Sequence, residues 1–159
     1  MALPAKLIAI DNLELAFDRV IRAQNRDYKA YFRHLCPSYQ LALHENLQDL
    51  ATDLRTGRYE PSRATCIFQP KKSGILRPLT LLGLTDQIVY QAIINLVANA
   101  SRADQKKYAF KWSFGAILTD KTSLFFYRSW KRCYRKFDAV ILTRFLRRTA
   151  TDRDPNEVA

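Results

Sequence analysis

The stretch "RATCIFQPKKSGILRPLTL", from Arg63 to Leu81, decides the fold prediction because it holds a turn between two β-prone runs. The runs "RATCIFQ" and "ILRPLTL" lie on either side of "PKKSG", and this pattern predicts a β-hairpin. Gly74 can adopt the positive φ that such a turn needs, and Pro70 stiffens the approach to it. Pro78 has no N–H to donate to a ladder, which predicts an edge strand or a strand that soon leaves the sheet.

Helical patterns precede the hairpin. Asp11 and Glu14 have the spacing of a capping box, which predicts a helix that opens at Asp11. A second helix is predicted to begin near Ser38 and to end at Gly57, a residue type suited to a helix C-terminus. Its core stripe has spacings of four, three and four residues: Leu43, Leu47, Leu50 and Leu54.

The pattern after the hairpin predicts two further helices with an aromatic segment between them. The run "TDQIVYQAIINLVANA" predicts a helix packed on more than one face, with Thr85 as its cap. The segment "KKYAFKWSFGAIL" is expected to be extended, with a second short strand pair around residues 108–118. A last helix is expected from about Thr122, and one apolar stripe lies along it: Phe126, Trp130, Cys133, Phe137 and Val140.

These elements predict a mostly helical α+β chain. Its 159 residues, 48% of them apolar, suit one domain or a well-formed fragment of a larger protein. We expect four regions: an N-terminal helical region (1–57), the hairpin with the following helix (58–105), a basic aromatic segment ending in a helix (106–148), and a polar tail (149–159).

Composition favours a soluble cytoplasmic protein without a metal site. No apolar run is long enough to cross a bilayer. The three cysteines form no CxxC pair and the two histidines stand ten residues apart, so we expect reduced thiols and no metal ligands. These five residues are Cys36, Cys66, Cys133, His34 and His44.

Positive charge is concentrated in residues 106–148, which hold 12 Lys/Arg against Asp120 and Asp138, whereas residues 1–105 hold 13 against 10 Asp/Glu. Positive charge interleaved with aromatics is typical of a polyanion-binding surface, although the solvated face of a basic protein would have the same composition. The aromatics could stack on bases or pack in a core, and we expect core packing for Trp130. The candidate nucleic-acid-binding residues are Lys111, Trp112, Arg128, Lys131, Arg132 and Arg135.

The hairpin carries the second candidate site. Lys71 and Lys72 lie at the turn and Arg77 follows on the returning strand. Neighbouring ammonium groups repel each other, so the pair adds little to stability, and an anion would explain it. Lysine as a mobile point charge and arginine as a rigid fork are suited to phosphate oxygens. A solvated turn with an unrelated strand arginine is the alternative.

The segment "YEPSRATCIFQPKKSGILRPLTLLGLTDQIVYQAIINLV" (59–97) resembles the fingers region of bacterial reverse transcriptases, as in group II intron, retron and defence-associated enzymes. That region has a tyrosine-x-proline, a proline-lysine, a glycine turn, an arginine-proline-leucine and an aspartate that opens a helix. The resemblance is looser over the rest of residues 12–140. The matching residues are Tyr59, Pro61, Pro70, Lys71, Gly74, Arg77, Pro78, Leu79, Asp86, Gln91 and Ala92.

The resemblance implies the fingers portion of an RNA-directed DNA polymerase, a nucleotidyltransferase. It implies that Lys71 and Arg77 contact the phosphates of an incoming deoxynucleoside triphosphate, with Lys72 assisting. An RNA or DNA template-primer and a palm-bearing chain would be the partners, with no role for a membrane. Many members have arginine after the aspartate, where this chain has Gln87.

The carboxylate half of such an active site is missing from the sequence. A complete enzyme would hold Mg²⁺ with a strand aspartate and a tyrosine-x-aspartate-aspartate turn, and no such turn occurs here. Asp138 precedes the apolar run "AVIL" instead of ending it, while Asp152 and Asp154 lie in the polar tail. We therefore predict no catalytic or metal residue and no polymerisation by this chain alone. A non-catalytic nucleic-acid-binding protein is the alternative.

The end of the chain, "TRFLRRTATDRDPNEVA", lacks the expected palm strand, which "DAVIL" begins to resemble. We interpret it as an out-of-frame or truncated end, or as one part of a split enzyme. Apolar faces that would meet a palm, including part of the helix over 85–100, are then expected to be exposed and to favour self-association.

Overall fold

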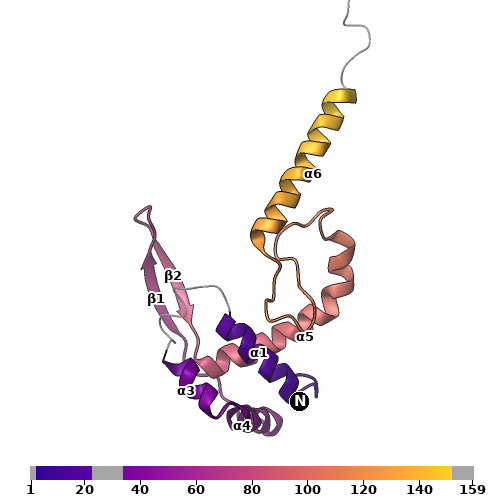
Figure 1. Cartoon of the computed structure of the whole chain (residues 1–159). Helices are drawn as coiled ribbons and strands as arrows, with labels where there is room; N and C mark the ends of the chain where they lie inside the picture. Colours follow the sequence, from indigo (N-terminus) through magenta and orange to yellow (C-terminus); the bar gives the residue numbers. More distant parts are fainter. Residues whose placement is uncertain (1–2, 23–33, 152–159) are drawn as a thin grey trace, which may run out of the picture. The chain divides into compact units, whose positions relative to one another are not determined.

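The computed structural model describes residues 3–22 and 34–151. Within them the chain forms five α-helices and one two-stranded antiparallel sheet (Figure 1), so the mostly helical α+β prediction is confirmed. The chain divides into two compact units, residues 1–99 (unit 1) and 100–159 (unit 2). The elements are α1 (Ile10–Arg22), α3 (Leu35–Leu41), α4 (Leu43–Thr56), β1 (Thr65–Pro70), β2 (Leu76–Leu81), α5 (Leu84–Tyr108) and α6 (Trp130–Thr151).

The first helix opens earlier than predicted. α1 begins at Ile10, and its first turn is closed by the N–H groups of Asn12 and Leu13, which both donate to the Ala9 carbonyl at 3.0 and 3.1 Å. Asp11 lies inside this first turn, so the prediction that it caps the helix is wrong. A carboxylate there still stabilises the helix, because the N-terminus of a helix carries partial positive charge.

The second predicted helix is two helices. α3 begins at Leu35 rather than near Ser38, and a break at Ala42 (φ −124°, ψ 43°) separates it from α4. Gly57 ends α4 with φ 73°, as predicted, and its N–H donates to the Asp53 carbonyl. Only glycine adopts this left-handed conformation without steric cost, so the residue fixes the end of the helix.

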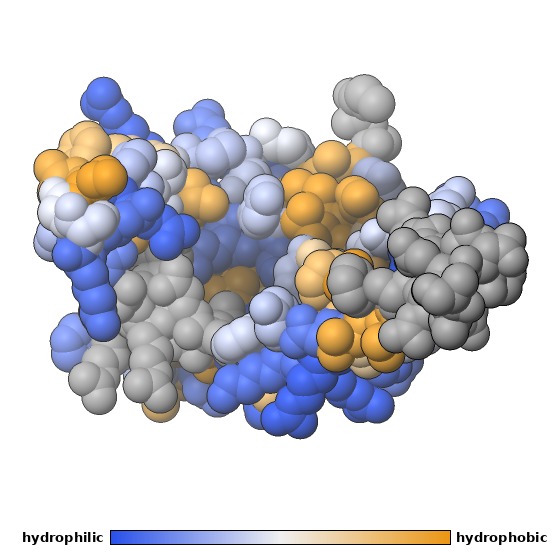
Figure 2. Space-filling view, turned by 90° about the horizontal axis from the view of Figure 1, so that it is seen from above, coloured by the Kyte–Doolittle hydropathy of each residue, from blue (hydrophilic) through white to orange (hydrophobic). Residues whose placement is uncertain are grey.

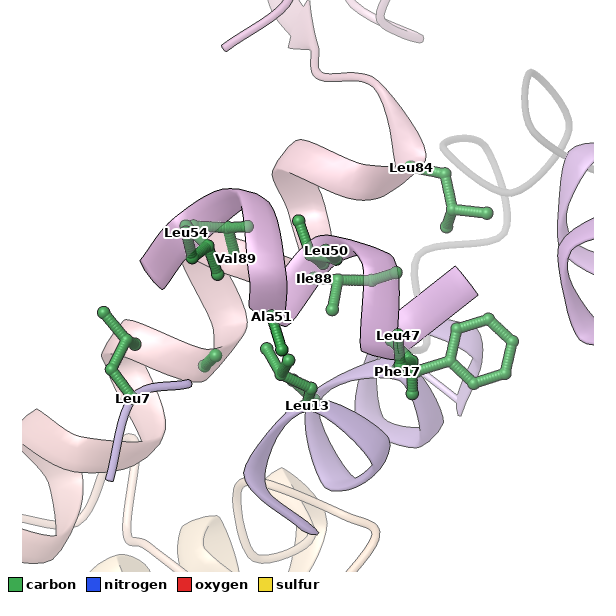
Figure 3. Close-up of a cluster of buried hydrophobic side chains, with 12 residues drawn as sticks. Leu7, Leu13, Phe17, Leu47, Leu50, Ala51, Leu54, Leu84, Ile88 and Val89 are labelled. Carbon is green, nitrogen blue, oxygen red and sulfur yellow. The ribbon is translucent and has the colours of Figure 1, made fainter. Parts of the chain in front are cut away.

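The core of unit 1 forms where α1, α4 and the first half of α5 meet. Their apolar side chains point toward one another (Figure 3), and Leu13, Leu47 and Ile88 are fully buried. Leu50 and Leu54 are buried as predicted, whereas Leu43 is only partly buried. Burial of this stripe supplies the main stabilisation of the unit, since roughly 25 cal/mol is gained per Å² of apolar surface removed from water.

A polar network crosses the same core. Arg19, 5% exposed, donates to the Asn95 side-chain oxygen at 2.6 Å, and Asn95, 2% exposed, donates to the Asn12 side-chain oxygen at 3.1 Å. Gln91 also donates to Asn95 at 2.9 Å. Buried polar groups need partners of this kind, because leaving one unpaired costs about 1–3 kcal/mol. The network therefore holds α1 and α5 in one register.

α5 is longer than predicted. It begins at Leu84, so Thr85 lies in its first turn and is not its cap, and it continues to Tyr108. Its buried residues lie around well over half of the helix circumference, so the prediction of packing on more than one face is confirmed. Tyr90, Ile93 and Val97 are 60%, 43% and 57% exposed and form the expected exposed apolar stripe.

Unit 2 departs most from the sequence prediction. Instead of a strand pair at 108–118, the described residues contain two isolated bridges, Ala109 with Ser113 and Leu118 with Tyr127. α6 begins at Trp130 rather than Thr122, and it remains helical through Thr151. The run "DAVIL", which resembled the beginning of a palm strand, is thus helical. Residues 152–159 of the polar tail, which include Asp152 and Asp154, lie outside the described residues.

Among the residues that the structure describes, no helix has the length and apolar character needed to span a membrane.

Candidate phosphate and nucleic-acid interfaces

The hairpin turn has a well-defined geometry. The Lys71 N–H donates to the Ile75 carbonyl at 2.9 Å, and the Gly74 N–H donates to the Lys71 carbonyl at 2.9 Å. Gly74 has φ 79°, the left-handed conformation predicted for it. This is a three-residue loop that ends in a glycine, a common hairpin connection. It holds the turn residues in a fixed place relative to the strands.

The strand register places two of the predicted phosphate-binding side chains on one face. Gln69 pairs with Arg77 across the ladder. Residues two apart along a strand share a face, so Lys71 lies on the same side as Gln69 and hence as Arg77. Lys72 lies in the loop itself. We call Lys71, Lys72 and Arg77 the hairpin cations.

The hairpin cations are solvated and uncompensated. All three are exposed, and none has a side-chain hydrogen bond or an ion pair within the described parts of the chain. The turn points away from α3 and α4 in Figure 1. An anion can therefore approach these three side chains without displacing an internal partner.

The opposite face of the hairpin is apolar, a feature that sequence reasoning missed. Phe68 pairs with Pro78 and Pro70 pairs with Leu76, and Phe68 and Leu76 are 64% and 58% exposed. Cys66 is on the same face and is also exposed. The alternation of the strand would have predicted this face had both sides of the hairpin been considered.

A buried carboxylate ties the base of the hairpin to α5. Asp86 accepts hydrogen bonds from the Tyr59 hydroxyl and the Ser62 hydroxyl, and the Ser62 N–H lies 3.2 Å from its Oδ2 atom. Gly83 makes room for this contact, since a Cβ there would lie 2.7 Å from the Ser62 hydroxyl and 3.1 Å from Oδ2 of Asp86. We call Tyr59, Ser62, Gly83 and Asp86 the hairpin anchor.

The hairpin anchor shifts the pKa values of its members. Burial of Asp86 acts to raise the pKa of its carboxyl, but the hydrogen bonds from Ser62 and Tyr59 outweigh it, so the pKa lies below its usual value. Burial and the hydrogen bond to Asp86 raise the pKa of Tyr59. Asp86 therefore remains charged and Tyr59 neutral at physiological pH. The next residue, Gln87, donates to the Leu82 carbonyl at 2.8 Å. Its side chain is neutral, whereas an arginine at this position would be charged.

In unit 2, the loop between α5 and α6 is held by side chains of α5. The Gln105 amide accepts from the Leu118 N–H at 2.9 Å and donates to the Ala116 carbonyl at 3.0 Å, and Arg102 donates to the Thr119 carbonyl. Ala116 and Phe110 have positive φ values of 50° and 60°, which are uncommon for residues other than glycine. The loop thus has a specific shape fixed by α5.

One cluster on this loop pairs cations with aromatic rings. The ring of Phe110 has the Lys136 ammonium 4.0 Å from its centroid and the Arg128 guanidinium 6.0 Å away. Phe114 packs edge-on against Phe137 of α6, with centroids 5.4 Å apart. Arg128, a predicted nucleic-acid contact, is thus placed over an aromatic ring. Lys136 belongs to the cluster although sequence reasoning did not select it.

A second cluster surrounds Trp112, which is 67% exposed. The Arg144 guanidinium lies 5.3 Å from the ring centroid and donates to the Lys111 carbonyl at 3.3 Å, while the Lys111 ammonium lies 5.9 Å from the same ring. Lys111 and Trp112 are therefore brought together as predicted. Arg144 was missed, because its contact with Lys111 joins residues 33 apart in the sequence.

The remaining predicted contacts lie on α6. Lys131, Arg132 and Arg135 are exposed and Arg132 and Arg135 have no partner among the described residues, whereas Cys133 is buried. Successive helical residues differ by about 100°, so these three cations lie on the sides of α6 away from Cys133. The six predicted nucleic-acid residues therefore form two groups, one on the loop and one on α6, rather than a single cluster.

Trp130 is 68% exposed, so the prediction that it packs in a core is wrong. The predicted start at Thr122 is wrong, because α6 begins at Trp130; Phe126 therefore precedes the helix, whereas the rest of the predicted stripe lies on α6. Lys131 lies 5.9 Å from the Trp130 ring centroid. On the face seen in Figure 2, hydrophobic and hydrophilic residues lie side by side.

Within the described residues, no three His, Cys, Asp or Glu side chains are grouped so as to hold a metal ion. Asp138 lies on α6 and is the only Asp or Glu in the sequence of that helix. Cys36, Cys66 and Cys133, all of which the structure describes, form no disulfide. The described residues therefore do not offer the grouped carboxylates that a two-metal polymerase centre uses.

No family model, curated protein or solved structure matches the chain.

Proposed function

We propose that the chain is the N-terminal and fingers portion of an RNA-directed DNA polymerase, in which the hairpin binds the phosphates of a deoxynucleoside triphosphate. The observation that carries the proposal is the register of the hairpin, because it puts Lys71 and Arg77 on one face with Lys72 at the tip. The order of the residues around them, which resembles reverse transcriptase fingers, supports the same function.

The electrostatics favour an anionic ligand at this place. Three exposed cations without carboxylate partners repel one another, and a triphosphate would relieve that repulsion. Arginine offers a planar fork to phosphate oxygens, and lysine adds mobile charge. The hairpin anchor at the base of the strands limits the freedom of the hairpin, which lowers the ordering cost of binding.

The binding test is calorimetric titration of the chain with a deoxynucleoside triphosphate. Lys71→Gln combined with Arg77→Gln should weaken binding at least about tenfold, because each charge-assisted hydrogen bond contributes roughly 1.5–3 kcal/mol. The control is Arg55→Gln with Arg63→Gln, which removes the same charge from exposed positions of unit 1. An equal loss of affinity in the control variant would show that the triphosphate is attracted only by the overall positive charge. Absence of binding to the unchanged chain would reject the phosphate site.

Catalysis by the proposed enzyme requires grouped carboxylates, and the described residues contain no such group. We therefore propose a palm-bearing partner chain that supplies them, with a template-primer held between the two. Purified chain given template, primer, deoxynucleotides and magnesium should show only background extension. Clear incorporation by the chain alone would contradict this part of the proposal.

A second candidate function is non-catalytic nucleic-acid binding by unit 2. The specific observation that favours it is that Arg132 and Arg135 on α6 are exposed and have no partner among the described residues, together with the exposed Trp112. Arginines that contact phosphates release counterions, so affinity should fall steeply as salt rises. Replacing Arg128, Arg132 and Arg135 by glutamine should weaken binding and flatten the salt dependence. If the salt dependence of the affinity is unchanged, these arginines do not contact the nucleic acid and contribute only to solubility.

A further inference from the structure

The surroundings of Trp112 are more specific than a basic surface requires. Trp112 is exposed although it lies in a loop whose backbone is fixed by Gln105 and Arg102. The Arg144 side chain crosses from α6, lies over the ring and is held by the Lys111 carbonyl. A large apolar ring is thus kept in water by contacts that do not bury it.

The combination of an exposed aromatic ring and two cations at Trp112 favours one class of ligand. Two cations beside the ring, Lys111 and Arg144, exclude a cationic ligand, and an acidic peptide would leave the ring without a flat group to cover. A neutral aromatic compound would make no use of the charges. A nucleotide has both a planar base and an adjacent phosphate, and so it matches the ring and Lys111 together.

We propose that Trp112, Lys111 and Arg144 form a stacking site for an unpaired base, so that unit 2 prefers single-stranded nucleic acid to duplex. In a duplex both faces of each base are already stacked, whereas an unpaired base can lie on an exposed indole. The proposal rests on the second proposed function, because it specifies the ligand of the same basic unit.

The polymer rather than the mononucleotide is the ligand, because a second pair of exposed cations, Arg128 and Lys136, lies at the Phe110 ring of the same loop. A mononucleotide would leave these charges unused. A backbone that carries one phosphate per nucleotide would contact several of them while one base stacks on Trp112.

The test measures fluorescence anisotropy of a labelled oligothymidylate of about 12 nucleotides, a length within the usual range of single-strand sites. Three ligands are compared with the full chain at one salt concentration: this oligomer, an abasic oligomer of equal length, and a duplex of the same length. The unmodified oligomer should bind at least about fivefold more tightly than either of the others, since one stacked base contributes at least that factor.

Trp112→Ala should lose at least about fivefold in affinity for the oligothymidylate, while Trp112→Phe, which keeps a flat ring, should retain most of it. Trp130→Ala is the matched control, because Trp130 is equally exposed at 68% but, among the described residues, has only the neighbouring Lys131 over its ring. It should change affinity less than twofold. Circular dichroism of each variant checks that the helices are intact.

The outcomes separate the two proposals. Equal affinity for the unmodified and the abasic oligomer, or an equal loss of affinity in Trp112→Ala and Trp130→Ala, would overturn the stacking site. Nucleic-acid binding by unit 2 would still be supported. Absence of binding to every oligonucleotide would instead overturn the nucleic-acid function itself.

Discussion

Units 1 and 2 are stabilised by different kinds of contact. Unit 1 has a continuous apolar core from α1, α4 and α5 with a buried polar network beside it. Unit 2 buries only Ile117 and Cys133 fully among its described apolar residues, and its loop depends on cation–aromatic contacts and on hydrogen bonds from α5. Side chains that stabilise unit 1 are therefore hidden from ligands, whereas those that shape unit 2 remain open to them.

The largest effect should come from a cavity in unit 1. Leu47→Ala removes a fully buried side chain and should lower the free energy of unfolding by about 2–5 kcal/mol. Leu142→Ala in unit 2 is the control, since Leu142 is 61% exposed, and it should change stability by less than about 0.5 kcal/mol.

Urea unfolding can follow the two units separately. Both tryptophans, Trp112 and Trp130, lie in unit 2, so their fluorescence reports that unit, while far-ultraviolet circular dichroism reports the helices of both. Leu47→Ala should shift the dichroism transition and leave the fluorescence transition in place. A joint shift would show that the units unfold together and would remove the contrast between them.

The next effect concerns the hairpin anchor. Asp86→Asn replaces a buried charged acceptor and should cost about 1.5–3 kcal/mol of unit 1 stability. Asp53→Asn is the matched control, because Asp53 pairs with Arg58 at 3.1 Å on the surface, where such a pair contributes about 0–1 kcal/mol. Equal losses in the two variants would show that the anchor adds no more than a surface ion pair.

The anchor also makes stability depend on pH. The pKa of Asp86 is lowered on folding, so its contribution is present above the unfolded pKa of about 3.9 and is lost as the pH falls through the folded value. The pKa of Tyr59 is raised, so its contribution is present below the unfolded pKa of about 10 and is lost as the pH rises beyond it. The stability difference between the unchanged chain and Asp86→Asn should narrow below about pH 4. A constant difference across that range would contradict the assignment.

The smallest effect should come from the turn. Gly74→Ala meets no atom within 4 Å but must adopt φ 79°, which should cost about 1–2 kcal/mol of unit 1 stability at most. Gly115→Ala in unit 2 also meets no atom within 4 Å and has no positive φ, so it should be neutral or slightly stabilising. If both variants behave alike in thermal melts, the turn does not depend on its left-handed glycine.

Local chemistry explains which elements the sequence could predict. The hairpin and the end of α4 were predictable because Gly74 and Gly57 each mark a left-handed residue, and the leucines of α4 repeat at helical spacing. The pair of Lys71 and Arg77 followed from the hairpin, since the register is set by the turn. Such features depend on neighbours within a few residues.

The features that were missed depend on contacts between distant residues. Asp86 lies 27 residues from Tyr59, so its anchoring role could not be derived from spacing. The late start of α6 reflects a loop shaped by Gln105, which no apolar periodicity reveals. Arg144 reaches Lys111 across 33 residues. Each of these contacts forms only after the local elements have been placed.

The face of the hairpin away from Lys71 and Arg77 provides a spectroscopic handle. Cys66 is exposed there, opposite Thr80, whereas Cys133 is buried and Cys36 is partly buried. A thiol-reactive fluorophore should therefore attach first to Cys66, on the side that leaves the cations uncovered. The labelled chain would report a phosphate ligand, or a partner that covers the apolar face, through a change in emission without any change in the groups that bind it.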